Sequence, residues 1–530
     1  MTTKDIEKDT GKSSKPAPLL FSSRLAIFLL FLTGTTQFLL QRFNINFALV
    51  CMVKNPTTLG QLGTNETNIT GSLDVLNIAE VEIIPSVLNL SLPFEAEDNP
   101  DYYECKKSIR VSANGSLTRE GEFEWSKDVQ GAILGSFFYG FVFTQIPGGW
   151  ISDRFGGKIA LLVTSIIFSV ITMLHPLFAR FGPEYLFGLR VIQGLSHGLT
   201  LPCINVISVR WSGPTERGFL MGIAYGGFSV GAVLTFPLCA LICEKLGWPF
   251  IFYITGGIGV IWCVAVYFFL FDTPEDHPRI SAEELEFLQK NRAVDQSSSK
   301  QKLKVPWMKI FLSVPVNALH AAHFCTLWGF QTLSMYLPSF MKEVLFMDVS
   351  TNGLVSSLPY VGMLVLHVGV GRFFDTVRAK NLCSITTLRK IFNTFGTFLP
   401  GISLLSVYFL TCRQYLGGIF AIAIGQAFIE FAMMGGYLFS VFELAPRFAG
   451  ILTGIMNTYG VLTGLLCPIA VSYLTPNGTR EEWLVVFYVA AGIVMVGCVV
   501  YLFFGSSELQ EWAKPPAGPR ETELKMVASH

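Results

Sequence analysis

The chain has 530 residues, of which 51% are hydrophobic and 14% are charged, and its formal net charge at pH 7 is zero. This composition excludes a string of soluble globular domains, in which about a quarter of the residues are charged. The charges form no long basic or acidic block, so nothing in them indicates a nucleic-acid partner. We therefore expect a lipid bilayer to surround most of the chain.

Apolar runs of about 20 residues, the length that crosses a hydrocarbon core of roughly 30 Å, recur from one end of the chain to the other. Because lipid offers no hydrogen-bond partner to a backbone, each run is expected to be a helix. The twelve runs lie at 23–53, 129–152, 158–179, 185–208, 220–243, 249–271, 310–341, 351–374, 388–411, 415–442, 449–473 and 483–504. The predicted fold class is an all-α membrane protein with twelve transmembrane helices.

Polar segments divide these helices into two groups of six. Residues 1–22, rich in Lys, Ser, Thr and Pro, predict a disordered cytosolic tail, and residues 505–530 predict a second cytosolic tail. The first six-helix bundle is expected at 23–271, with a glycosylated lumenal or extracellular loop at 54–128, and the second at 310–504. Between them, residues 272–309 predict a cytosolic linker whose stretch 281–290 has a capped, amphipathic helical pattern.

The charge distribution predicts that both termini are cytosolic. Lys and Arg are more frequent in the short loops on the side of the amino terminus, as the positive-inside rule requires. Asn-X-Ser/Thr sequons, which are glycosylated on the lumenal or extracellular side, all fall on the opposite side. They are Asn65, Asn68, Asn89 and Asn114 in the first loop and Asn477 between the last two helices.

The cysteines and histidines show no metal-binding pattern. Most of the 11 cysteines lie within apolar runs and are expected to be small buried residues. Cys105 and Cys412 lie clearly on the lumenal side, and whether they pair stays open. His320, His323 and His367 have apolar neighbours and no zinc-type spacing, so we expect no metal and no cofactor other than a co-transported ion.

A repeated motif lies between the second and third helix of each half. The first copy, GWISDRFGGK (149–158), contains Gly149, Asp153, Arg154, Gly156 and Lys158. The second copy, GRFFDTVR (371–378), contains Asp375 at the corresponding place. Glycine permits a tight turn and a close helix approach, and an acid and a base at such a turn can lock or release two bundles. The motif predicts a gating loop.

The first copy resembles the signature loop of the major facilitator superfamily, and RVIQG (190–194) is similar to the arginine motif of that group. Further segments resemble the anion:cation symporter family of sialin, vesicular glutamate transporters and sodium-phosphate transporters, with sialin-like members nearest. These segments are LGSFFYGFVFTQIPGGW (134–150), PTERG (214–218), SSLPYVG (356–362), ELAPRFAGILTGIMNTYG (443–460) and TREEWLVVFYVAAG (479–492). The resemblance covers most of 125–514 and implies the major facilitator fold, in which two six-helix bundles are pseudo-symmetric.

Two arginines inside apolar helices are candidates for anion binding. An ionisable residue in a membrane helix is costly, and a guanidinium group binds carboxylate or phosphate through paired hydrogen bonds. The family resemblance implies that Arg42 binds the anion and that Arg190 places a second positive group in the central cavity. Alternatively, Arg42 extends to the lumenal interface and Arg190 ties helix ends together.

Candidates for ion coupling are His197 and Glu430. Sialin-like members tend to have carboxylates at the positions of Gln193 and His197, and this chain departs from them. His197 titrates near neutral pH when it is exposed, so it is a candidate proton carrier, or else a neutral cavity residue. Glu430, buried by its sequence context, is a cation or proton site, or a group that pairs with Arg42, Arg190 or a histidine.

Other positions bear on the substrate. Tyr139, beside small residues, is the aromatic residue that we predict to contact it. Vesicular glutamate transporters resemble this chain with an arginine where Thr326 stands, which disfavours glutamate. Ser440, Val441 and Glu443 stand where sialin-like members tend to have Asn, His and Asp, which disfavours strict selectivity for sialic acid.

The sequence thus predicts a secondary active transporter, not an enzyme, that moves a small organic anion or phosphate by alternating access, coupled to H⁺ or Na⁺. An uncoupled anion channel and a non-transporting receptor on the same fold are the alternatives. We expect a monomer in the lysosomal, vesicular or plasma membrane.

Overall fold

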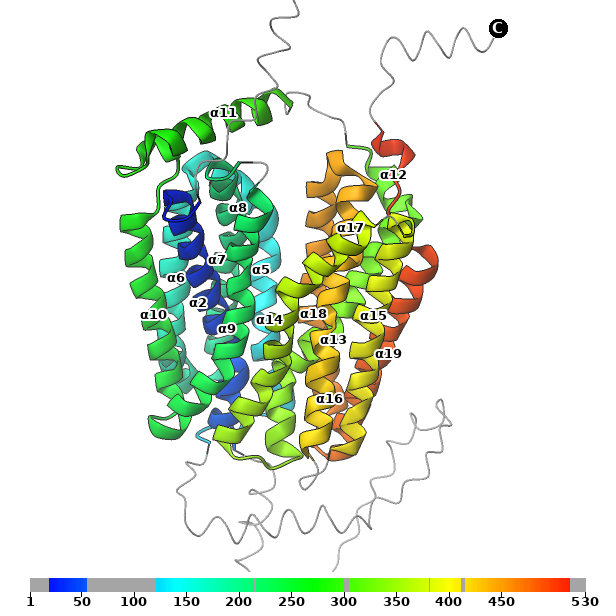
Figure 1. Cartoon of the computed structure of the whole chain (residues 1–530). Coiled ribbons are helices and arrows are strands. Elements are labelled where there is room, and N and C mark those ends of the chain that lie inside the picture. The colour runs from blue at the N-terminus through cyan, green and yellow to red at the C-terminus, as the bar shows by residue number, and fades with distance from the viewer. Residues whose placement is uncertain are drawn as a thin grey trace, which may run out of the picture.

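The computed structural model describes residues 19–54, 121–213, 216–298, 305–380, 382–410 and 415–514. These residues form helices that run side by side in two groups, one on each side of Figure 1. The predicted all-α membrane fold with two six-helix bundles is therefore confirmed. Within the described ranges, nine helical segments are long and apolar enough by themselves to cross a membrane.

The first bundle contains six spans. They are α2 (Ser23–Met52), α5 (Lys127–Phe155), α6 (Gly157–Phe181), α7 (Pro183–His197) with α8 (Thr200–Arg210), α9 (Arg217–Lys245) and α10 (Trp248–Phe269). The run predicted as the fourth helix is therefore two shorter helices, α7 and α8. Neither is long enough to cross a membrane by itself.

The second bundle also contains six spans. They are α13 (Val314–Glu343), α14 (Val349–Ala379), α15 (Ile385–Leu405), α16 (Tyr415–Ala427) with α17 (Tyr437–Leu444), α18 (Ala449–Leu474) and α19 (Arg480–Phe504). The run predicted as one helix at 415–442 is interrupted by a π-helical turn, Phe431–Gly435. Such turns are rare and often occur at functional sites.

The two ends of the bundles are distinct, and we name them by what they carry. The linker end carries α11 (Ala282–Ser298) and α12 (Trp307–Leu312), at the top of Figure 1. The loop end carries Val53 and Phe123, which flank the segment 55–120, and Asn477 between α18 and α19. At this end the backbone N–H of Phe123 donates to the carbonyl of Met52 at 2.9 Å.

The linker helix α11 is attached to the first bundle through a buried arginine. Arg24, at the start of α2, donates from Nε to Glu284 of α11 at 3.0 Å and from Nη1 to Glu216 at 2.6 Å. Its guanidinium also lies 4.9 Å from the ring centre of Phe287. Because two carboxylates and an aromatic face surround one buried cation, α11 is expected to move together with the first bundle.

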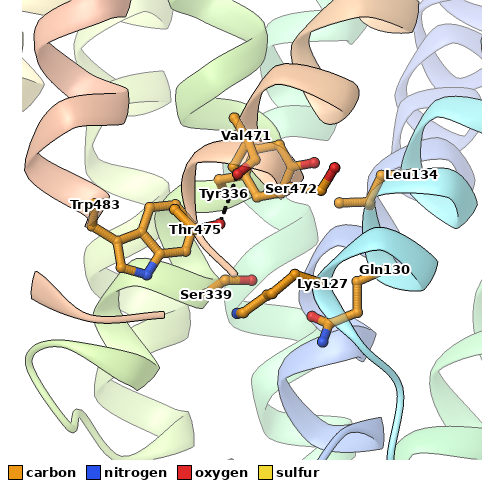
Figure 2. A pocket seen from close by; sticks show the side chains of 9 residues that line it. All are labelled: Lys127, Gln130, Leu134, Tyr336, Ser339, Val471, Ser472, Thr475 and Trp483. Carbon is orange, nitrogen blue, oxygen red and sulfur yellow. Dashed lines mark hydrogen bonds between the residues drawn. The ribbon is translucent and has the colours of Figure 1, made fainter. Parts of the chain in front are cut away.

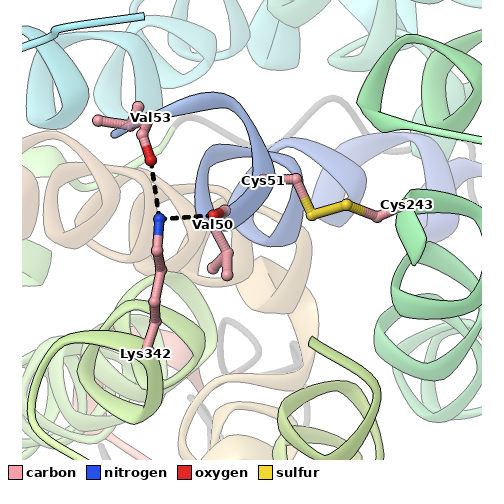
Figure 3. Close-up of a disulfide and its surroundings, with 5 residues drawn as sticks. All are labelled: Val50, Cys51, Val53, Cys243 and Lys342. Carbon is pink, nitrogen blue, oxygen red and sulfur yellow. Dashed lines mark hydrogen bonds between the residues drawn. A yellow bond between two sulfur atoms is a disulfide. The ribbon is translucent and has the colours of Figure 1, made fainter. Parts of the chain in front are cut away.

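A disulfide joins α2 to α9 at the loop end (Figure 3). It links Cys51 to Cys243, which are 192 residues apart in sequence. The expectation that cysteines within the apolar runs are small buried residues is therefore wrong for this pair. Both lie at the last turns of their helices, where the sulfur atoms reach each other. Cys105 and Cys412 lie outside the described residues.

Helices α5 and α7 approach each other so closely that two glycines are required. A Cβ atom added to Gly194 of α7 would lie 1.9 Å from the carbonyl oxygen of Phe137. One added to Gly140 of α5 would lie 1.9 Å from the carbonyl oxygen of Val191. Both contacts are with backbone, which cannot move aside as a flexible side chain does. This approach sets the positions of Phe137 and Arg190.

We predict that Gly194→Ala destabilises the protein and that Gly188→Ala does not. A methyl group at position 194 forces α5 and α7 apart, at a cost of about 1–3 kcal/mol. Gly188 lies in the same helix, and a Cβ there would meet nothing within 4 Å. The measurement is the midpoint of thermal unfolding of each purified variant in detergent. Equal midpoints for the two variants would contradict the close packing.

Candidate functional site

The guanidinium group of Arg42, on α2, lies within a cluster of phenylalanine rings. The guanidinium carbon of Arg42 lies 5.1 Å from the ring centre of Phe137 and 5.0 Å from that of Phe138. Phe43 and Phe141 are at 5.7 and 6.0 Å. The negative faces of aromatic rings attract a cation, so these rings hold the positive charge in a place with few polar partners.

Arg190 of α7 reaches the same cluster from another helix. It is 2% exposed, and its guanidinium carbon lies 5.3 Å from the ring centre of Phe137. Arg42 and Arg190, which are 148 positions apart in the sequence, thus share the ring of Phe137. Phe137 is fully buried, so the shared contact is fixed by the packing of α2, α5 and α7.

A chain of amide and hydroxyl groups supports Arg190. Its Nη1 donates to Oε1 of Gln193 at 2.9 Å, and Nε2 of Gln193 donates to the hydroxyl of Thr172 at 2.9 Å. That hydroxyl donates to Oε1 of Gln41 at 3.0 Å, and Gln41 donates to Gln37 at 2.5 Å. Gln37 and Gln41 are not among the residues predicted from the sequence, although two amides four residues apart in an apolar helix form a recognisable polar stripe.

The positive charge of this site has no negative counterpart within the described part of the chain. Neither Arg42 nor Arg190 forms an ion pair with a described acidic side chain. Arg190 donates instead to the neutral amide of Gln193, and Arg42 lies over phenylalanine rings. The Nε of Arg190 is buried and has no hydrogen-bond partner. A buried charge without a partner costs several kcal/mol, and a bound anion would remove much of that cost.

His197 closes the cluster on the side of the α7–α8 break. It is 2% exposed and lies among four phenylalanine rings, with ring centres 5.2–5.6 Å away. The four are Phe38, Phe137, Phe141 and Phe168. Its Nδ1 has no hydrogen-bond partner. His197 thus lies beside the arginines but in an apolar enclosure.

Tyr139 lies apart from this cluster. Its side chain is 41% exposed, and its ring centre lies 5.9 Å from that of Phe187. Phe137, Phe138 and Phe141 occupy the inner face of the same helix. The role of Tyr139 as a substrate contact stays a prediction.

Glu430 also lies apart from the arginines, in the second bundle. Its Oε2 is 2.9 Å from Nδ1 of His367 in α14. Of the partners that the sequence left open for this acid, the structure selects a histidine. The sequence leaves a histidine open as the partner but does not indicate which one, because the pairing joins positions 63 residues apart.

The predicted gating loop is held by an acid that the sequence analysis did not single out. Gly156 has a φ of +89°, and a Cβ there would lie 3.0 Å from Oδ2 of Asp272. The backbone N–H of Lys158 donates to Oδ1 of Asp272 at 2.8 Å, and Nη1 of Arg210 is 3.9 Å from the same oxygen. The carboxylate at the end of α10 therefore fixes the turn between α5 and α6.

Other residues of the two motif copies take different positions. Gly149 lies within α5, Arg154 is exposed near its end, and the side chain of Asp153 lies outside the described residues. Asp375 is exposed on α14. Near the second copy of the motif lies Glu443, whose Oε1 is 2.8 Å from Arg389 and 3.8 Å from Arg378.

The bundles are joined by polar contacts toward the loop end. Lys127 of α5 forms an ion pair with Glu343 of α13, and Trp483 donates to the same carboxylate at 3.1 Å. Lys342 donates to the carbonyls of Val50 and Val53, both at 2.7 Å (Figure 3). We call these contacts, made by Lys127, Glu343 and Lys342, the loop-end latch.

The latch lies beside two cavities. A cavity of about 360 Å³ is lined by both of its lysines and by Lys54, Glu124 and Ser339. Figure 2 shows a smaller pocket nearby, to which α5, α13, α18 and α19 all contribute. Lys127 and Ser339 line both. The latch therefore borders cavities that are lined by both polar and apolar side chains.

Of the predicted glycosylation sites, the structure describes Asn477. It is exposed at the loop end, and its Nδ2 donates to Glu482 at 2.9 Å. Asn65, Asn68, Asn89 and Asn114 lie outside the described residues.

Comparisons with known proteins agree with this architecture. Residues 86–468 match the model of the Major Facilitator Superfamily. A solved D-xylose–proton symporter covers 91% of the chain and is itself covered completely, with a TM-score of 0.57 at 14% identity. A bacterial homologue of the human lysosomal transporter Spinster covers 93% of the chain, and 99% of it is covered, with a TM-score of 0.60 at 13% identity. These two likenesses concern the fold alone.

Curated relatives are closer in sequence. Human sialin is 36% identical over 445 residues, 83% of this chain and 86% of sialin. Human vesicular glutamate transporter 2 is 34% identical over 408 residues, 76% of this chain and 70% of that protein. An uncharacterized transporter of Caenorhabditis elegans is 34% identical over 510 residues, 95% of each chain. The chain therefore belongs to the major facilitator superfamily and, within it, to the family of sialin and the vesicular glutamate transporters, which are transporters and not enzymes.

Proposed function

We propose that this transporter carries a small organic anion, or phosphate, by alternating access and that an H⁺ or Na⁺ gradient drives it. The observation that supports this proposal is the uncompensated positive charge of Arg42 and Arg190 around Phe137. Charge-assisted hydrogen bonds to a carboxylate or phosphate are about twice as strong as neutral ones. The buried, unpartnered Nε of Arg190 is a donor available to such an anion.

The loop-end latch supports the alternating-access part of the proposal. Lys127 and Glu343 come from different bundles, and so do Lys342 and Val50. A hydrogen bond of 2.9 Å from the side-chain amide of Asn46 to the carbonyl of Ser334 continues the contact between α2 and α13 deeper in the protein. We propose that these contacts close the loop end while the substrate exchanges with the linker end, and that they break when the bundles rock.

We further propose that the loop end faces the lumen or the cell exterior and that both termini are cytosolic. The Cys51–Cys243 disulfide supports this orientation, because disulfides persist in oxidising compartments. The sequon at Asn477 lies at the same end. Relatives include sialin and vesicular glutamate transporters, and we propose a lysosomal, vesicular or plasma membrane location. A monomer without a bound cofactor is sufficient for this mechanism.

The decisive experiment is uptake into proteoliposomes that contain the purified protein. Labelled sialic acid, glutamate, urate and phosphate are offered separately, under an imposed proton gradient or an imposed sodium gradient. We expect one of these anions to accumulate above its equilibrium concentration under one of the two gradients. Saturable uptake that only equilibrates would indicate a facilitator, and the absence of uptake of all four anions would contradict the proposed substrate class.

We predict that Arg42→Ala and Arg190→Ala each reach the membrane and lose transport of the accumulated anion. Loss of one charge-assisted hydrogen bond of about 1.5–3 kcal/mol lowers kcat/KM roughly 10- to 150-fold. Arg42→Lys keeps the charge and is expected to retain more activity than Arg42→Ala, because an ammonium group still attracts the anion. The measurement is the concentration dependence of uptake, normalised to protein in the membrane; normal kinetics in both alanine variants would remove the proposed anion site.

We predict that reversing either charge of the Lys127–Glu343 pair opens the loop end more often. Ser339, which lines the adjoining cavities, is replaced by cysteine as a reporter, and its labelling by a membrane-impermeant thiol reagent is measured from the loop side. Labelling should be faster with Lys127→Glu or with Glu343→Lys, since like charges then face each other across the bundles.

The double variant with both charges exchanged should return labelling toward the original rate. The matched control is Lys54→Glu, because Lys54 pairs with Glu124 at 2.8 Å in the segments that border the first bundle. That change should leave the labelling rate nearly unaltered. If Lys54→Glu accelerates labelling as much as Lys127→Glu does, the Lys127–Glu343 pair does not keep the loop end closed.

A further inference from the structure

The break in the tenth span carries a buried acid and base. Glu430 lies between the end of α16 at Ala427 and the π-helical turn that begins at Phe431. Its Oε2 is 2.9 Å from Nδ1 of His367 on α14. The side chains are 5% and 21% exposed, respectively. The pair therefore joins two helices at an irregular point of the second bundle, where an ionised group is costly.

The charge of this pair depends on a single proton. With an ionised Glu430 and a neutral His367 the pair carries one negative charge. Addition of one proton gives either a carboxylate beside an imidazolium or a carboxylic acid beside a neutral imidazole, and the pair is then neutral. An uncompensated charge inside a membrane protein is unfavourable. Proton binding therefore lowers the free energy of the state in which both ends of the transporter are closed and the pair is shielded from water.

On the surrounding helices, no other described side chain is placed to neutralise the negative charge of the Glu430–His367 pair. From α17, Tyr437 lies near Glu430, and its hydroxyl group bonds to Nδ1 of His323 of α13 at 3.1 Å. From α15, Arg389 is occupied by Glu443 and by the carbonyl of Gly435. Other charged groups of the neighbouring elements include Arg24 and Arg42 of α2, Lys342 and Glu343 at the end of α13, and Lys390 of α15. Arg372, Asp375 and Arg378 lie late in α14, and Arg217, Glu244 and Lys245 lie at the ends of α9.

We propose that His367 and Glu430 together bind the co-transported proton, so that the coupling ion of this transporter is H⁺. This inference rests on the proposed function, since it names the ion that drives it. The imidazole is the more exposed member of the pair, and it exchanges the proton with water while the carboxylate holds the proton inside the bundle. The anion binds in the first bundle and the proton in the second, and both are carried in the same closed state.

The first test needs no substrate. Infrared difference spectra of the purified wild-type protein are recorded as the pH is varied, and the C=O band of a protonated carboxyl group is followed together with the imidazole bands. We expect the carboxyl and imidazole signals to titrate as one coupled unit. The carboxyl signal should be absent in Glu430→Gln and the imidazole signal absent in His367→Gln, the remaining signal should shift in each case, and both should shift in Glu430→Asp. A titration that is the same in all four proteins overturns the proposal.

The second test is transport of whichever of sialic acid, glutamate, urate and phosphate the wild-type protein accumulates. Glu430→Gln and His367→Gln are expected to lose at least ten-fold of the accumulation driven by a proton gradient. They should retain exchange of labelled for unlabelled anion at equal pH, which needs no net proton movement. Loss of accumulation together with retained exchange separates a coupling residue from a structural one.

The matched control is His320→Gln. His320 is a buried histidine of α13 that stacks on Tyr459 at 5.3 Å and forms no ion pair with a described acid. This variant should accumulate the anion as the wild type does. Accumulation by Glu430→Gln at the wild-type level, or wild-type accumulation that follows a sodium gradient and ignores the proton gradient, overturns the proposal. If no anion of the panel is transported, the proposed function fails, and the infrared titration still decides whether the pair binds a proton.

Discussion

The rest of the structure depends on two guanidinium groups that share the ring of Phe137. Arg42 and Arg190 come from α2 and α7, and both lie within 5.3 Å of that ring's centre. Like charges repel, so the protein must hold the two helices in place against this repulsion. The aromatic cluster surrounds both guanidinium groups, and the close contact between α5 and α7 that Gly140 and Gly194 permit fixes the shared ring of Phe137 against α7.

The polar chain behind Arg190 keeps the site positive. Gln193 supplies an oxygen to the guanidinium without supplying a negative charge, and Thr172 and Gln41 continue the chain to α2. A carboxylate at position 193 would satisfy the same hydrogen bond and would cancel the charge at the same time. Gln193, where sialin-like members tend to have a carboxylate, therefore leaves the positive charge of Arg190 in place. Binding of an anion then reduces the free-energy cost of burying that charge.

Acids and bases in the second bundle are arranged in the opposite way. Arg389 pairs with Glu443, and Glu430 pairs with His367, so each of these four groups lies close to a partner. At the loop end, Lys127 and Glu343 join the two bundles directly. The molecule thus combines an unbalanced charge in one bundle with a titratable pair in the other, and connects the bundles by contacts at one end.

The sequence by itself determined the helices, their grouping and the two arginines, because hydrophobic length and a charge inside an apolar run are local properties. It could not determine which residues meet. Helix rotation and neighbours far away in the chain decide the breaks at α7–α8 and at Glu430, the Cys51–Cys243 bridge, the role of Asp272 and the exposure of Tyr139. Only the tertiary structure decided that His367 meets Glu430, because a distance of 2.9 Å between residues of two helices is set by packing and leaves no mark in either local sequence.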